Sequence, residues 1–130
     1  MIVLDASAIV EMLLRTSAGA SIAERLLTRK VSFHAPHLLD LEVAHTLRRL
    51  VARDGLPQGR ARQALLDLAD FRLQRYPHQL LLPRVWHLRE NLTAYDAAYV
   101  ALAETLDATL VTRDGRIARA PGHSVRVEVF

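Results

Sequence analysis

Hydrophobic and polar positions follow two different periods along the chain. Short segments that are continuously apolar, or apolar at every second position, predict β-strands. Longer segments with apolar residues three or four positions apart predict amphipathic helices. The strands predicted in this way are residues 2–4, 31–35, 109–112 and 124–129. The predicted helices are residues 8–15, 20–28, 38–53, 59–71, 83–90 and 95–106. The residues that follow Pro77 are ambiguous between strand and loop.

The alternation of strands with helices predicts an α/β fold. In such a fold a central parallel sheet is covered by helices on both faces, which gives three layers. The segment Ile2-Val3-Leu4 is entirely apolar, as expected for a central strand that is buried on both sides. The 130 residues show no internal repeat and no linker, so residues 1–130 are predicted to form a single domain.

Composition places the chain among ordinary globular proteins. Hydrophobic residues make up 51% and charged residues 24% of the chain, and the lack of cysteine excludes disulfides and thiolate chemistry. Lys30 is the only lysine among 17 basic residues, so the formal charge of +3 rests on arginine, which binds phosphates bidentately. This bias fits a nucleic-acid partner and equally a codon preference. No leader-like segment or long apolar span is present, which predicts a soluble, cytoplasmic protein without membrane contact.

Four carboxylates stand at positions that such a fold brings to one edge of its sheet. Asp5 follows the first predicted strand directly, and Asp114 follows the strand 109–112 by two residues. Glu42 lies in the first turns of the helix after the second strand, and Asp96 lies in the first turn of an alanine-rich helix. Because ligands bind outside the carboxyl ends of parallel strands, we expect the four side chains to share one rim.

Taken singly, each carboxylate has a structural explanation. Asp96 follows Thr93 at the spacing of a capping box, and Glu42 near a helix start complements the helix dipole. Asp114 begins an ordinary Asp-Gly turn, and Asp5 is placed to cap the helix that follows it.

Taken together, the four carboxylates need a common compensation. Two carboxylates about 4 Å apart repel by roughly 1 kcal/mol in water and about 4 kcal/mol at a partly buried site. The only basic residue adjacent in sequence to any of them is Arg113. A hard divalent cation is the economical solution, because Mg²⁺ and Mn²⁺ favour carboxylate and water ligands. Such ions activate water and stabilise the charge of an in-line phosphoryl displacement. The sequence therefore predicts that Asp5 helps to hold a metal ion.

The segments around these carboxylates resemble those of one family. Asp5 lies in VLDAS, Glu42 in LLDLEVAHTLRR, Asp96 in TAYDAAYVALAE and Asp114 in LVTRDGRIAR. This set resembles PIN-domain ribonucleases along the entire chain, and the small single-domain size is similar to that of VapC toxins from toxin–antitoxin pairs. The resemblance implies a PIN-like three-layer α/β/α fold. TAYDAAYVALAE followed by LVTRD is its most specific part.

The resemblance also implies a function and a site. It implies a metal-dependent endoribonuclease that cleaves RNA as a toxin, forms a homodimer and is inhibited by a cognate VapB-like antitoxin. The residues that would bind Mg²⁺ or Mn²⁺ are the four carboxylates Asp5, Glu42, Asp96 and Asp114. The hydroxyls of Ser7 and Thr112 stand beside two of these carboxylates and would support them or position water.

The positions of several other residues predict a role for each of them. Arg48 and Arg49 on the long helix, together with Arg113, are candidate RNA contacts, and a solvated helix face is an equal alternative for the first two. Trp86 lies between apolar residues and is expected in the core, and Asp40 is expected to cap its helix.

Two other classes of function are alternatives. One is a non-catalytic RNA-binding domain that retains the rim of carboxylates, although the intact set of four argues against it. The other is a receiver-like phosphoacceptor domain, which is also α/β with aspartates at strand ends. Asp54, near mid-chain, follows a predicted helix rather than a strand, and the paired N-terminal acids and late lysine that such chemistry needs are missing.

Overall fold

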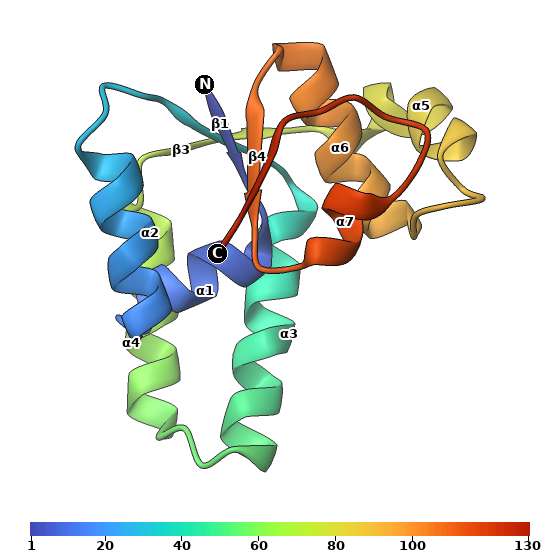
Figure 1. The fold of residues 1–130 in the computed structure, drawn as a ribbon. Helices are drawn as coiled ribbons and strands as arrows, with labels where there is room; N and C mark the ends of the chain where they lie inside the picture. Colours follow the sequence, from blue (N-terminus) through green and yellow to red (C-terminus); the bar gives the residue numbers. More distant parts are fainter.

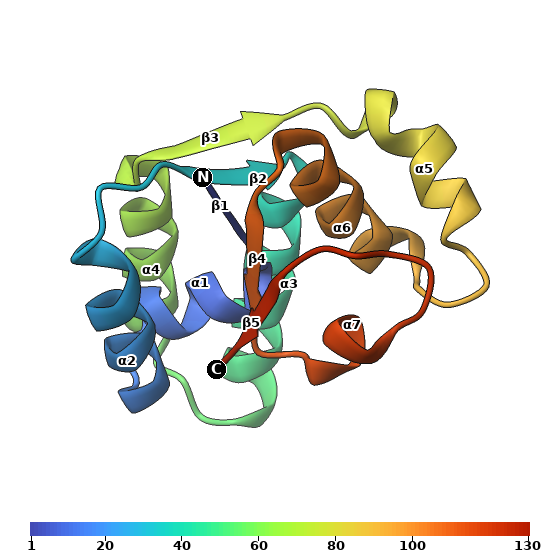
Figure 2. The ribbon, with the colours of Figure 1, turned by 45° about the horizontal axis from the view of Figure 1, so that its top comes forward.

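The computed structural model describes residues 1–130 and contains one sheet of five strands. The strands run in the order β3-β2-β1-β4-β5, with β1 at the centre (Figure 2). Their bounds are β1 (Ile2–Leu4), β2 (Phe33–Pro36), β3 (Leu73–Tyr76), β4 (Thr109–Thr112) and β5 (Val127–Val129). Every neighbouring pair of strands is parallel. The prediction of an α/β fold around a central parallel sheet is confirmed.

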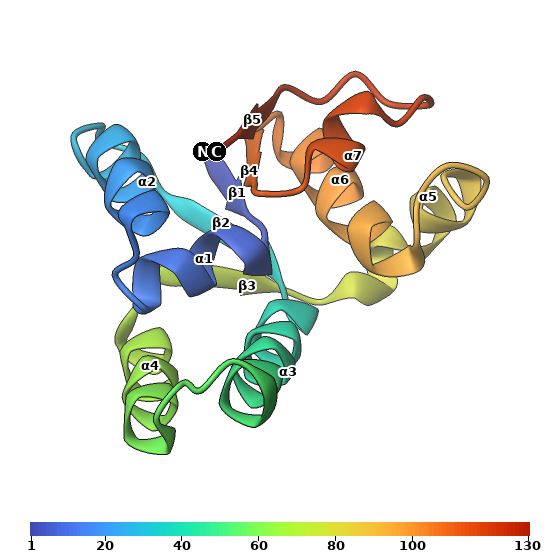
Figure 3. The same ribbon diagram turned by 60° about the horizontal axis from the view of Figure 1, so that its bottom comes forward.

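Helices cover both faces of this sheet, so that the fold has three layers (Figure 3). Those on one face are α1 (Ala6–Leu13), α2 (Ser17–Leu27), α3 (Leu38–Arg53) and α4 (Gln58–Asp70). Those on the other face are α5 (Leu82–His87), which follows the 3₁₀ turn η1 (His78–Leu81), α6 (Ala94–Leu106) and α7 (Gly115–Arg119). Right-handed crossovers explain the division, because the chain builds outward from β1 to β3 and then returns past β1 to β4. None of these helices combines the length and the apolar character needed to cross a lipid bilayer.

The centre of the core lies between β1 and α6. All three residues of β1 are buried, as predicted for a central strand. Residues 97–103 of α6 are buried without interruption, as the alanine-rich sequence predicts, and the small side chains let this helix lie close to the sheet. Tyr95, in the first turn of α6, lies outside this buried stretch and is 65% exposed.

Three parts of the fold differ from the prediction. The pattern does not predict β3, because this edge strand has the sequence Leu-Gln-Arg-Tyr and buries none of its residues completely. The Asp-Gly turn predicted after β4 begins a further short helix, α7, with Asp114 at its N-cap. The predicted strand 124–129 is shorter than expected, since only Val127–Val129 pairs with β4.

Two side chains have different roles from those predicted. Trp86 is 67% exposed, so the prediction of a core residue is wrong. Its neighbours Val85 and Leu88 are buried, but Trp86 lies one position away from their stripe on α5 and therefore points elsewhere. Asp40 does not cap α3, because its carboxylate accepts hydrogen bonds from Arg75 at 2.7 and 2.9 Å and so links α3 to β3.

The helices that follow β1 and β4 lie on opposite faces of the sheet. α1 leaves the carboxyl end of β1 on one face of the sheet, whereas α7 leaves the carboxyl end of β4 on the other (Figure 1). A crevice forms outside the sheet at such a switch point, and ligands of open α/β sheets bind there. Asp5 follows β1 directly, and Asp114 follows β4 by two residues.

Candidate active site

A cleft of about 730 Å³ lies at this switch point. A face of α3 forms one wall, the start of α6 forms another, and the start of α1 contributes the floor. The cleft is lined by all four predicted carboxylates, Asp5, Glu42, Asp96 and Asp114. The structure thus brings together side chains from four separate segments, and their role as metal ligands stays a prediction.

Asp5 is the most buried of these carboxylates, with only 7% of the residue exposed. Its backbone N–H donates to the carbonyl of Val111 at 3.0 Å, which fixes the end of β1 against β4. Its Oδ2 accepts hydrogen bonds from the hydroxyls of Ser7 at 2.8 Å and Thr112 at 2.5 Å. Asp5 holds the N-cap position of α1 but makes no side-chain capping bond, so its carboxylate is oriented by these hydroxyls instead.

The same two hydroxyls also join the loop after β4 to the floor of the cleft. Ser7 Oγ accepts from the backbone N–H of Arg113 at 3.0 Å, and Thr112 Oγ1 accepts from the backbone N–H of Asp114 at 2.9 Å. Ser7 and Thr112 therefore lie beside Asp5 and Asp114, where the sequence places them. They form a small network that fixes the spacing between the ends of the two central strands.

Glu42 is held by a tyrosine that the sequence does not single out. The hydroxyl of Tyr99, on α6, donates to Glu42 Oε1 at 2.7 Å, and Tyr99 is completely buried. Burial raises the pKa of Glu42, and repulsion by Asp5 and Asp96 adds to the rise against the opposing hydrogen bond from Tyr99. Burial also raises the pKa of Tyr99 well above its usual value, so the phenol stays protonated and remains a donor.

Asp96 faces the cleft from the first turn of α6. The capping role predicted for this turn belongs to Thr93, whose hydroxyl accepts from the backbone N–H of Asp96 at 3.2 Å. Burial raises the pKa of the Asp96 carboxyl, and the charges of Asp5 and Asp114 raise it further. Two of the four carboxyls in the cleft therefore bear an electrostatic cost in their ionised form.

Asp114 differs from the others because it has its own counterion. Its carboxylate accepts from Arg116, with Nη2 to Oδ2 at 2.6 Å and Nε to both oxygens at 3.0 Å. This pairing lowers the pKa of Asp114. Arg113, the neighbour singled out in the sequence, lies 3.6 Å from Glu11 instead. The local compensation therefore comes from Arg116, which pairs with Asp114 alone and opposes the rise in the pKa of Asp96 only as a minor contribution.

The donor set fits a hard divalent cation. All four side chains offer carboxylate oxygens, the ligands that Mg²⁺ and Mn²⁺ prefer. Both hydrogen bonds to the Asp5 carboxylate go to Oδ2, so Oδ1 has no hydrogen-bond partner. The raised pKa values of Glu42 and Asp96 are those of a site that lacks positive charge. In the structure as it stands, no three acidic or histidine side chains converge closely enough to hold an ion.

The wall formed by α3 carries residues at helical spacing. Its cleft-facing positions are Leu38, Leu41, Glu42, His45, Thr46 and Arg49. The opposite side of α3 is buried through Leu39, Val43 and Leu47. Of the three arginines predicted to contact RNA, only Arg49 lines the cleft. Arg48 lies instead at an apolar hollow between α3 and α4.

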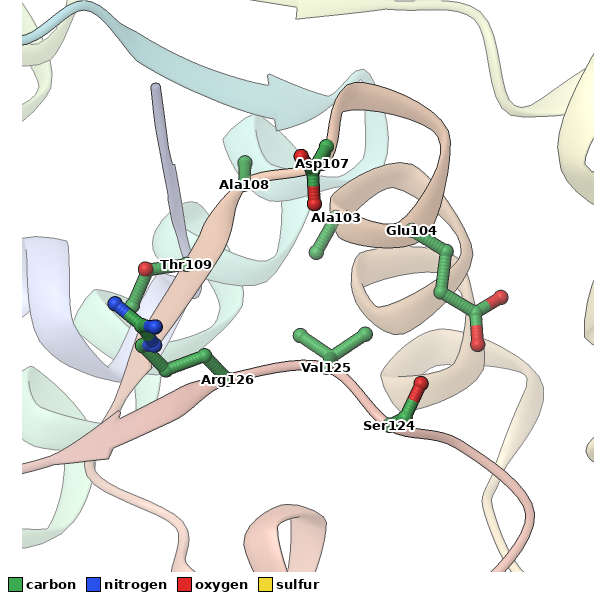
Figure 4. A pocket seen from close by; sticks show the side chains of 8 residues that line it. All are labelled: Ala103, Glu104, Asp107, Ala108, Thr109, Ser124, Val125 and Arg126. Atoms are coloured by element: carbon green, nitrogen blue, oxygen red, sulfur yellow. The ribbon is translucent and has the colours of Figure 1, made fainter.

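A separate hollow of about 640 Å³ lies away from these residues, at the amino end of β4. Figure 4 shows that its lining comes from the end of α6, the start of β4 and the segment before β5. It contains Glu104, but Arg84 already binds that carboxylate at 2.7 and 2.8 Å. This hollow has no cluster of unpaired acids and is not a candidate for metal chemistry.

Comparisons with known proteins agree with one another. The family model described as PIN domain matches residues 2–123. Ribonuclease VapC1 of Mycobacterium tuberculosis is 48% identical over 121 residues, which cover 92% of this chain and 90% of that protein. Ribonuclease VapC12 of the same organism is 40% identical over 129 residues, which cover 99% and 98% of the two chains.

Solved structures show the same fold at low sequence identity. VapBC2 from Rickettsia felis, bound to a DNA fragment from its promoter, is similar with a TM-score of 0.70 and 17% identity over 98% of both chains. A toxin–antitoxin complex from Klebsiella pneumoniae is similar with a TM-score of 0.65 and 15% identity over 88% of both chains. At these identities the likeness concerns the fold alone.

Proposed function

The chain belongs to the PIN-domain family, and on that premise we propose that it is a metal-dependent endoribonuclease and the toxin of a toxin–antitoxin pair. Its curated relatives at 48% and 40% identity are VapC ribonucleases, and they match nearly the whole chain. An RNA-cleaving hydrolase is the activity that this relationship supports. The metal dependence and the residues responsible for it are the finer part of the proposal.

The observation that carries the finer proposal is the shared cleft. Four carboxylates from segments far apart in sequence line one cleft between the carboxyl ends of the two central strands. We assign Asp5, Glu42, Asp96 and Asp114 as the residues that hold Mg²⁺ or Mn²⁺. When bound, such an ion supplies an activated water and stabilises negative charge on a phosphate.

Neighbouring residues orient two of these carboxylates through hydrogen bonds and an ion pair. Ser7 and Thr112 hold Asp5 by Oδ2 and leave Oδ1 without a hydrogen-bond partner. Arg116 neutralises Asp114 in the free chain, and its side chain is 81% exposed. Because this guanidinium is largely exposed, water can solvate it when a cation competes for Asp114.

A cleavage assay tests the metal mechanism directly. We expect the purified chain to cut RNA with Mg²⁺ or Mn²⁺ and to lose all activity in EDTA. Asp5→Asn keeps the hydrogen bonds from the two hydroxyls but removes a charged ligand, and we expect it to be inactive. Asp54→Asn is the matched control, since this exposed carboxylate lies at the end of α3, outside the cleft. Cleavage that persists in EDTA, or an Asp5→Asn variant with full activity, refutes the metal assignment.

The partner and the cellular role are tested separately. Because similar folds occur in toxin–antitoxin complexes, we assign a cognate VapB-like antitoxin as partner, with a homodimer and a cytoplasmic location as further parts of the proposal. Expression of the chain alone is expected to arrest growth, and co-expression of the small protein encoded beside it is expected to restore growth. An active nuclease whose expression leaves growth unchanged is not a toxin.

A further inference from the structure

We propose that Tyr95 stacks on an unpaired base of the RNA substrate while His45 and Arg49 bind the neighbouring phosphate. The inference rests on the proposed ribonuclease function and specifies how the strand lies in the cleft. It assigns a role to three cleft residues that the metal chemistry does not use.

Tyr95 has the exposure and the position of a stacking residue. It directly precedes Asp96, lines the cleft and is 65% exposed. Its hydroxyl has no hydrogen-bond partner, and no aromatic or cationic group packs on its ring. Tyr99, one helical turn later, is completely buried and bound to Glu42. The same helix therefore buries one tyrosine in the protein and presents the ring of the other to the cleft, without a side-chain hydrogen bond or an aromatic contact.

The opposite wall offers positive charge and donors. Glu42, His45 and Arg49 are spaced by three and four residues, so they follow one face of α3 away from the carboxylates. Arg49 is exposed, makes no ion pair and is the only arginine that lines the cleft. The rise of an α-helix places the backbone of Arg49 about 10 Å along the axis from that of Glu42, and Arg49 does not contribute to the pKa shift of Glu42. Its charge is therefore available to a phosphate beside the reacting one.

An unpaired nucleotide is the ligand that fits both walls. A base within a duplex has both faces stacked, whereas an unpaired base exposes a face to an aromatic side chain. Leu41, which is 76% exposed, adds an apolar edge to the α3 wall of the same cleft. Acidic residues repel a phosphate unless a cation intervenes, so the arginine end of the cleft is where the rest of the strand finds attraction.

The test compares the effect on RNA cleavage of replacing two aromatic residues that are similarly exposed, Tyr95 and Trp86. Cleavage of a single-stranded RNA oligonucleotide with Mg²⁺ or Mn²⁺ is measured for Tyr95→Ala, Tyr95→Phe and Trp86→Ala. Trp86 is 67% exposed but does not line the cleft. We expect Tyr95→Ala to lower kcat/KM by about 5- to 150-fold, which corresponds to roughly 1–3 kcal/mol of stacking. Tyr95→Phe keeps the ring and should stay within about twofold of wild type, as should Trp86→Ala.

A second measurement checks the phosphate contact. Binding of the same single strand to an Asp5→Asn background is measured over a series of salt concentrations, with the fully paired duplex as comparison. Arg49→Gln should weaken binding and lower the salt dependence by about one phosphate contact. Tyr95→Ala in this background should remove the preference for the single strand over the duplex.

The negative results of these experiments distinguish an error in the proposed function from an error in the stacking inference. If the wild type cuts no RNA, the proposed function fails, and the binding series still decides whether Tyr95 stacks on bases. Full activity and full single-strand preference in Tyr95→Ala overturn the inference. A change in molecular mass of Tyr95→Ala from dimer to monomer, with a matching loss of activity, also overturns it, because the ring then covers a second copy of the chain.

Discussion

Replacing Tyr99 by phenylalanine removes one oxygen from the support of the cleft and leaves the core filled. The phenol of Tyr99 donates to Glu42 at 2.7 Å, and the ring is completely buried in α6. Because phenylalanine keeps the ring, Tyr99→Phe creates no cavity in the side-chain packing. The perturbation is the loss of one hydrogen bond to a carboxylate.

The expected loss of stability depends on the strength of this hydrogen bond and on how water solvates Glu42 once the bond is gone. A hydrogen bond to a charged group contributes roughly 1.5–3 kcal/mol. Glu42 is only half-buried, so water from the cleft replaces part of the lost bond, and the phenol no longer has to be desolvated. We therefore expect a loss of about 1 kcal/mol near neutral pH, or about 3–5 °C in Tm for a chain of this size.

The loss of stability in Tyr99→Phe is expected to be smaller at low pH. The hydrogen bond from Tyr99 opposes the rise in the pKa of Glu42, so its removal lets that pKa rise further. In the pH range between the two values the variant binds more protons than the wild type. The difference in stability therefore shrinks as the pH falls through the raised pKa of Glu42.

Thermal melts over a series of Mg²⁺ concentrations provide the assay. Mg²⁺ should stabilise the wild type, by about 2.7 kcal/mol at a hundredfold excess over the dissociation constant. Tyr99→Phe should need about tenfold more Mg²⁺ for the same gain, because partners that orient metal ligands have effects of this size.

Tyr76→Phe is the matched control. Its hydroxyl contacts His34 Nδ1 at 2.8 Å, outside the cleft, so its loss should cost about 0.5–1.5 kcal/mol and leave the Mg²⁺ midpoint unchanged. Equal Mg²⁺ midpoints for the two tyrosine variants would refute the reasoning, since Glu42 would then not depend on Tyr99 for metal binding.

The remaining predictions concern charge and packing. In EDTA, Tm should fall as the pH rises from about 4 through the raised pKa values of Glu42 and Asp96, and Mg²⁺ should remove that fall. Asp96→Asn should melt no lower than wild type in EDTA at pH 7 but gain much less from Mg²⁺; a lower Tm with an unchanged gain would make Asp96 a structural residue. Gly19→Ala should destabilise the fold by about 1–3 kcal/mol or more, because an added Cβ would lie 2.0 Å from the carbonyl oxygen of Glu11. Gly59→Ala meets no neighbour within 4 Å and should raise stability by about 0.4–1 kcal/mol in the same melts.

The central strands could be predicted because a single factor, burial on both faces of the sheet, determines their sequences. β1 and β4 lie in the middle of the sheet, so burial on both faces selects short apolar runs. β3 lies at the edge and is only partly buried, so its Leu-Gln-Arg-Tyr sequence has no such signal. The exposure of Trp86 cannot be predicted for a related reason, since its apolar neighbours indicate a helix but not which side of it faces the core.

The candidate site also has a part that the sequence predicts and a part that it does not. The positions of Asp5 and Asp114 follow from strand ends alone, and the fold then brings Glu42 and Asp96 to the same cleft. The partnership between Glu42 and Tyr99 joins residues 57 positions apart, and nothing in either local sequence indicates it. Arg116 is near Asp114 in sequence, but its pairing depends on the short helix α7, whose five residues are too few to form a recognisable period.

The two faces of α3 have a consequence for how such proteins diversify. Leu39, Val43 and Leu47 anchor one side of the helix in the core, while His45 and Arg49 lie on the side that lines the cleft. Because a helix moves as a rigid element, a conservative replacement such as Val43→Ile shifts the cleft wall as it repacks the interior. A substitution in the interior can therefore change the shape of the cleft without altering any residue that lines it. Two proteins with the same cleft-lining residues can in this way differ in the spacing between those residues.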